Sequence, residues 1–118
     1  MPYADLREFL VKLEACGKLH RIRQAVDKDW EIAAVCRQLF YKIPPERRPA
    51  LMFENVQGFK IPVVAGVLGA SREIYAIGLE TNSVDGINRK WDQALEKPIP
   101  PRLVKDGPCK ENILTGNQ

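Results

Sequence analysis

The chain has 118 residues, of which 45% are hydrophobic and 28% charged, as is typical of one soluble globular domain. Eighteen Lys and Arg against fifteen Asp and Glu give a net charge of +3. The basic residues are scattered along the chain, which argues against a nucleic-acid-binding protein. No apolar run approaches the roughly 20 residues that span a bilayer, and the first residues lack the features of a signal peptide. We therefore expect a cytoplasmic protein without a membrane span.

The first predicted element is a helix from Asp5 to Cys16. Asp5 can cap the free backbone N–H groups, and Glu8, three residues later, completes a capping-box spacing. Gly17 is suited to the left-handed residue that ends a helix. One apolar stripe with helical spacing is formed by Leu6, Phe9, Leu10 and Leu13.

A strand over Leu19–Val26 and a second helix are predicted next. Asp27 and Asp29 offer carboxylates that could cap this helix. Pro44-Pro45 must end it, because proline cannot donate the helical hydrogen bond. From Trp30 onward its apolar stripe is Ile32, Cys36, Leu39, Phe40 and Ile43.

The stretch Ala50–Gly69 contains two apolar runs that are short enough to be strands. Ala50–Phe53 is the first and Ile61–Val67 the second, with a turn-forming segment, Glu54–Gly58, between them. Because Ile61–Val67 is apolar almost without alternation, we expect it to be covered on both faces. The rest of the chain should pack against these two strands.

Two helices should follow. Ser71 is the expected N-cap of a helix that ends near Leu79, and Thr81-Asn82-Ser83 should break it. Ser83 is the expected cap of the next helix, in whose first turn Gly86 is unfavourable. The stripe of that helix is Val84, Ile87, Trp91, Ala94 and Leu95.

After this helix the pattern changes. Lys97–Pro101 is a proline-rich connector, and Lys110–Leu114 resembles the start of another strand. We predict one α/β (α+β) domain over residues 1–96, a small mixed sheet flanked by helices. Residues 97–118 should connect it to a further domain. The predicted order is helix, strand, helix, strand, strand, helix, helix.

Few residues suggest catalysis. His20, the single histidine, lies at a predicted helix-to-strand junction without evident partners for a catalytic or metal site. Asp27 and Asp29 are paired carboxylates, for which capping is the simpler role. The cysteines have no metal-binding spacing and are expected to be free, buried or half-buried thiols: Cys16, Cys36 and Cys109.

Three other features allow both a structural and a functional interpretation. The turn Gly66–Ser71 follows a strand and precedes a helix, as phosphate-binding turns do, but its G-x-x-G spacing favours a tight structural turn. Arg47 and Arg48 are expected in a solvated loop, where they could pair with another domain. Trp30 and Trp91 are expected to anchor the core or a domain interface.

Several phrases together resemble one family. They are DLREFLVKLEACGKLHRI, EIAAVCRQL, PALMFENVQGFKIPVVAGVLGASRE and PIPPRLVKDGPCKENILTGNQ, and they occur in the same order in the N-terminal part of UbiD-type carboxy-lyases. The resemblance extends from Asp5 to the end of the chain. PALMFENVQG and GPCKENILTG are its most specific parts.

The resemblance implies a part of an enzyme that reversibly decarboxylates aromatic or α,β-unsaturated carboxylic acids. Such enzymes use prenylated FMN, held with a divalent metal, usually Mn2+, and K+ in a middle domain that also carries a Glu-Arg-Glu network. No position of this chain matches those residues, so we expect no catalytic, cofactor-binding or metal site here. The implied partners are the flavin-binding and C-terminal domains of the same protein, in a homo-oligomer.

Two alternatives remain open. The chain could be a stand-alone interaction module or accessory subunit, or a small nucleotide-binding domain that uses Gly66–Ser71.

Overall fold

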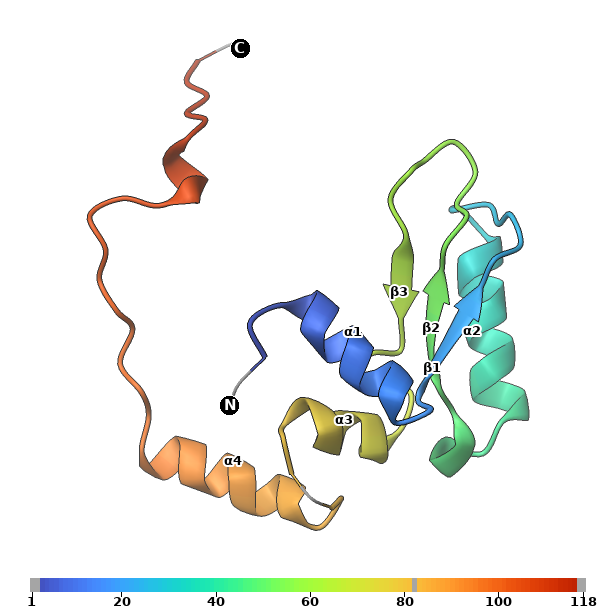
Figure 1. The fold of residues 1–118 in the computed structure, drawn as a ribbon, viewed down its shortest axis with the longest axis horizontal. Helices are drawn as coiled ribbons and strands as arrows, with labels where there is room; N and C mark the ends of the chain where they lie inside the picture. The colour runs from blue at the N-terminus through green and yellow to red at the C-terminus, as the bar shows by residue number, and fades with distance from the viewer. Residues whose placement is uncertain (1–2, 82, 117–118) are drawn as a thin grey trace.

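The computed structural model describes residues 3–81 and 83–116. Within these residues the regular elements follow the predicted order (Figure 1). The helices are α1 (Leu6–Ala15), α2 (Glu31–Lys42), α3 (Arg72–Gly78) and α4 (Gly86–Glu96). The strands are β1 (Leu19–Ile22), β2 (Ala50–Phe53) and β3 (Val63–Ala65). Two short 3-10 turns, η1 (Pro45–Arg47) and η2 (Pro108–Lys110), complete the described elements.

The three strands form one mixed sheet with β2 in the middle. β1 pairs with β2 in parallel, from Leu19 opposite Ala50 to Ile22 opposite Phe53. β3 pairs with the other edge of β2 in the antiparallel sense. Parallel neighbours require a crossover, and α2 provides it between β1 and β2. The predicted fold class, a small mixed sheet flanked by helices, is confirmed.

One hydrophobic cluster joins the sheet to α2. Leu51 and Phe53 lie on the same face of β2, because side chains two residues apart on a strand point to the same side, and both are buried. Val26 and Val56, which form an isolated parallel bridge, extend this cluster beyond the strands. From α2 the cluster receives Ile32, Val35, Cys36 and Leu39.

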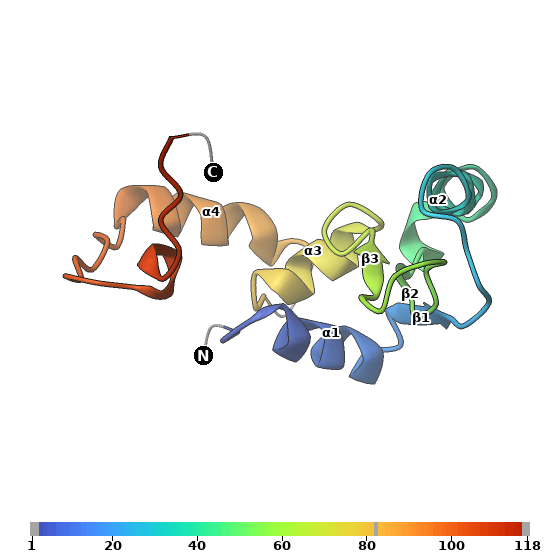
Figure 2. The ribbon, with the colours of Figure 1, turned by 90° about the horizontal axis from the view of Figure 1, so that it is seen from above.

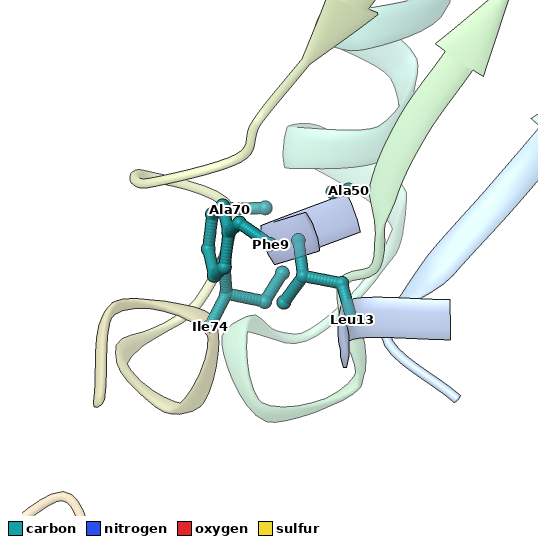
Figure 3. Close-up of a cluster of buried hydrophobic side chains, with 5 residues drawn as sticks. All are labelled: Phe9, Leu13, Ala50, Ala70 and Ile74. Atoms are coloured by element: carbon teal, nitrogen blue, oxygen red, sulfur yellow. The ribbon is translucent and has the colours of Figure 1, made fainter. Parts of the chain in front are cut away.

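A second cluster lies at the start of β2 and joins it to α1 and α3. Phe9 and Leu13 of α1 meet Ala50, Ala70 and Ile74, and the side chains converge in Figure 3. Figure 2 shows α1 and α2 on opposite sides of the sheet. The two clusters therefore share β2, which contributes Ala50 to one and Leu51 and Phe53 to the other.

The strands differ from the prediction in length and burial. β1 ends at Ile22, and Val26 pairs only through its isolated bridge, so the predicted strand to Val26 is too long. The expectation that Ile61–Val67 is covered on both faces is wrong. β3 is a short strand bonded only to β2, and the side chain of Ile61 is 74% exposed. The strand buried on both faces is β2 instead.

Three of the predicted helix signals are confirmed. The Asp5 carboxylate accepts the Glu8 N–H at 3.0 Å, and the Glu8 carboxylate accepts the Ala4 N–H at 2.7 Å. Gly17 has a positive φ of 67° at the end of α1. The Ser71 hydroxyl accepts the Ile74 N–H at 3.2 Å, at the start of α3.

The predicted caps of α2 and α4 are wrong. The Asp27 carboxylate accepts the Asp29 N–H at 2.6 Å within its own turn, and α2 starts after Trp30 without a side-chain cap. α4 starts at Gly86, whose N–H reaches the carbonyl of Ser83 at 3.1 Å. Asn82, part of the predicted break, lies outside the described residues.

The C-terminal part leaves the body of the molecule. α4 contacts α3 and then runs outward, and residues 97–116, called the arm below, continue as an extended segment (Figures 1 and 2). The radius of gyration is 17.9 Å, against about 13 Å for a compact domain of some 100 residues. The predicted strand at Lys110–Leu114 is wrong: this segment holds the end of η2 and irregular backbone. Among the described helices none has the length and apolarity that crossing a bilayer requires.

Alanine substitutions at two glycines with similar backbone angles distinguish the cost of backbone strain from the cost of side-chain crowding. Gly58 and Gly66 have φ values of 79° and 72°, so alanine is strained at both, by about 1–2 kcal/mol. A Cβ on Gly66 would lie 3.0 Å from the Cβ of buried Ala70, whereas one on Gly58 would meet nothing within 4 Å. Gly66→Ala should therefore lower the free energy of unfolding clearly more than Gly58→Ala, measured by urea titration. Equal losses would contradict the packing described for this turn.

Candidate functional site

The residues that were considered for a catalytic role, for which no site was predicted, lie apart from one another. His20 is exposed on β1, opposite Leu51 in the register. It lines a shallow groove of about 520 Å³ beside β1, whose far wall includes Val35 of α2. Asp27 and Asp29 are engaged in the turn before α2, where Asp29 also pairs with Lys28. These residues therefore do not form a common catalytic arrangement.

The glycine turn serves α3. Gly66 supplies the positive φ, and its carbonyl accepts the Ala70 N–H at 3.2 Å. The Ser71 hydroxyl accepts the Ile74 N–H and so caps the first turn of α3. α3 itself has only seven residues. The turn thus has the geometry of a structural connection, as its spacing predicts.

Arg48 and Arg47 have different environments. The Arg48 guanidinium donates to the carbonyls of Phe40 and Ile43, both at 2.7 Å, and lies 4.9 Å from the centre of the Phe40 ring. It thereby satisfies carbonyl groups that the end of α2 leaves without helical partners. Arg47 is exposed in η1. The prediction of a solvated side chain is confirmed for Arg47 and is wrong for Arg48, which is bonded to the end of α2.

The tryptophans and cysteines are more exposed than predicted. Trp30 is exposed at the start of α2, and Trp91 is half exposed, with its indole N–H donating to the Tyr75 hydroxyl at 3.0 Å. The prediction that either tryptophan anchors the core of this domain is therefore wrong. All three cysteines are free. Cys36 is half-buried, and burial raises the pKa of its thiol, whereas Cys16 and Cys109 are exposed.

An ion-pair network that the sequence did not reveal connects α1 to the sheet. Arg21 donates two hydrogen bonds to Glu14, at 2.6 and 2.8 Å, and one to Glu54 at 2.6 Å. Arg23 adds a weaker bond to Glu54 at 3.3 Å. The hydrogen bonds from Arg21 hold the pKa of each glutamate below its ordinary value, and those carboxylates raise the pKa of Arg21. The network fixes α1 against β1 and the end of β2.

A second polar connection links three elements. The Lys18 ammonium, just before β1, pairs with Glu73 of α3 and donates to the carbonyl of Glu46 in η1 at 3.0 Å. These partners lie far apart in the sequence, so a single side chain holds the α1–β1 turn, η1 and α3 together.

The grouping of possible metal ligands bears on the metal that the family resemblance implies. In the part of the chain that the structure describes, no three His, Cys, Asp or Glu side chains are grouped so that they could hold a metal ion. The polar groups with defined partners serve helix ends, turns and contacts between elements. Their arrangement supports a framework that holds the elements together.

Comparison with known proteins identifies the family. Residues 10–91 match the family model of the 3-octaprenyl-4-hydroxybenzoate carboxy-lyase N-terminal domain. The chain is 37% identical over 120 residues to a phenolic acid decarboxylase of Sedimentibacter hydroxybenzoicus, a match that covers 95% of this chain and 24% of that protein. The chain belongs to the UbiD family and corresponds to its N-terminal domain.

Solved structures agree with this assignment. The fold matches a vanillic acid decarboxylase of S. hydroxybenzoicus in open form, with a TM-score of 0.75, 35% identity, and coverage of 95% of this chain and 25% of that one. It also matches an evolved dimeric form of the UbiD-class enzyme HmfF from Pelotomaculum thermopropionicum, in complex with prenylated FMN. That match has a TM-score of 0.70 and 40% identity, over 86% of this chain and 22% of the other. The chain thus spans about a quarter of the length of these relatives.

The Arg21 network should be visible in carboxyl titrations. Because Arg21 lowers the folded-state pKa of Glu14 and Glu54 below the ordinary 4.5, its stabilising effect is complete above that pH. The effect is lost as the pH falls through the lower folded-state values. In Arg21→Met, NMR titration should show both pKa values moving up towards 4.5. Arg7→Met removes the same charge from an exposed pair with Asp5 and should leave them unchanged. Identical titrations of Glu14 and Glu54 in wild type and Arg21→Met would contradict the network.

Proposed function

We propose that this chain acts as the non-catalytic N-terminal domain of a UbiD-type carboxy-lyase. The observation that carries the proposal is the match of residues 10–91 to the family's N-terminal domain, in relatives about four times as long. Two of those relatives are named as decarboxylases, and one solved relative holds prenylated FMN. The internal polar contacts of this chain support the same role, because they hold its elements together.

In this proposal, residues 1–96 are the domain and residues 97–118 lead to a flavin-binding domain of the same polypeptide. The whole protein would reversibly decarboxylate an aromatic or α,β-unsaturated carboxylic acid in the cytoplasm. Prenylated FMN, with Mn2+ and K+, would be bound outside this chain and would accept the electrons released as CO2 leaves. The part played by residues 3–116 would be to present a rigid framework to that neighbour, within a homo-oligomer.

The exposed apolar side chains of α4 and the arm also favour a second candidate. Leu95 and Leu103 could meet a separate protein chain as well as a following domain, which would make this chain an accessory subunit. The reading frame of the source gene separates the two: a frame that continues beyond Gln118 supports the first, and a stop codon there supports the second.

The proposal predicts that catalysis requires more than this chain. The purified 118-residue chain, supplied with prenylated FMN, Mn2+ and K+, should release no CO2 from a panel of aromatic and α,β-unsaturated acids. A polypeptide that includes the following domains should be active under the same conditions. Turnover by the isolated chain, in proportion to its concentration, would contradict the non-catalytic role.

A further inference from the structure

An apolar stripe starts in the core at α4 and continues out of the molecule. Ile87, Trp91 and Leu95 recur every four residues on α4, and their exposed fractions rise from 6% to 48% to 72%. Beyond the end of α4, Ile99 and Leu103 follow in the irregular backbone of the arm and are 93% and 95% exposed. The residues Ile87, Trp91, Leu95, Ile99 and Leu103 are called the ridge below.

The ridge is continuous with a groove on the body. Trp91 donates its hydrogen bond to Tyr75, and Tyr75 lines a groove of about 280 Å³ between α1 and α3. The walls of this groove include Leu6 and Leu68, which are both more than half exposed. In Figure 1, α3 lies between α1 and α4, and the arm leaves from the far end of α4. Exposed apolar side chains such as Leu6, Leu68 and Leu95 are of the kind that occurs at protein contacts.

The arm has little internal support for its extended course. Within it, all described residues except Gly107 are exposed, and hydrogen bonds such as that from Lys110 N–H to the Gly107 carbonyl join near neighbours. The match to the vanillic acid decarboxylase covers 95% of this chain, and so includes most of the arm. In that relative, about three quarters of the chain lies outside the match.

We propose that the ridge docks into an apolar groove of the domain that follows in the same polypeptide. This inference rests on the proposed function, because it takes the partner to be the rest of a UbiD-type enzyme. α4 and the arm would lie along that domain, so that Ile87 remains in the core while Leu95, Ile99 and Leu103 become buried. Trp91, at the border, would contact both sides.

Hydrogen–deuterium exchange tests the proposal on the full polypeptide encoded by the source gene, with the isolated 118-residue chain as reference. Docking should slow the amides of α4 and those of Ile99, Leu103 and Val104 at least tenfold in the full polypeptide. The amides of α2, whose contacts lie within this chain, should exchange equally in both. Equal exchange of α4 and the arm in the two proteins would overturn the proposal.

Matched serine variants locate the contact. Leu95→Ser lies on the ridge, whereas Val11→Ser lies on α1 at a site that is 66% exposed. Neither should change the unfolding of the isolated chain, because both side chains are exposed there. In the full polypeptide, Leu95→Ser should restore fast exchange at Leu103, and Val11→Ser should not. The same response to both variants would contradict docking through the ridge.

Two further results separate this proposal from the one on which it rests. If the full polypeptide is an active decarboxylase but the ridge exchanges freely, docking through the ridge is wrong while the proposed function stands. If the isolated chain forms a dimer by light scattering and Leu95→Ser makes it a monomer, the ridge belongs to a second copy and the proposal is overturned. A monomeric isolated chain together with a protected ridge in the full polypeptide supports it.

Discussion

The structure depends on the burial of β2, which contributes buried side chains to both hydrophobic clusters. Ala50 faces Phe9 and Leu13 of α1, while Leu51 and Phe53 face the side of the sheet that α2 covers. β2 is also the only described strand with a bonded neighbour at both edges. A four-residue strand therefore fixes the distance between the two helical layers. Changes at its buried positions should affect both clusters together, because each uses the same backbone.

Polar contacts at the margins orient the elements around β2. Arg21 ties α1 to the sheet, and Lys18 connects the α1–β1 turn with α3 and η1. Exposed ion pairs individually contribute little to the free energy of folding. Their role here is therefore to orient elements that apolar burial already holds together. α4 contacts α3 and Trp91 donates a hydrogen bond to Tyr75, but the apolar stripe of α4 is buried only at Ile87 and becomes exposed towards Leu95. This contrast between a braced body and the exposed end of α4 with the arm is the basis of the proposed docking.

Local signals predicted much of this fold, and tertiary contacts determined the rest. Asp5 and Ser71 could be identified because a cap involves residues three apart in the sequence. The apolar pattern of Ile61–Val67 could not show that Ile61 and Val63 would be exposed. The Arg21 network joins residues 7 and 33 positions apart, a distance at which sequence patterns carry no pairing information. The family resemblance predicted the domain type, whereas the exposure of Trp91 required coordinates.

The central claim is that this chain supports a flavin-binding neighbour and performs no chemistry itself. A structure of the full polypeptide with its bound flavin tests this most directly, through the surroundings of the Leu95 side chain and the residues that touch the cofactor. The account predicts that Leu95 is buried against residues beyond this chain and that the flavin contacts come from those residues. A flavin held by residues 3–116, with Leu95 still in water, would contradict it.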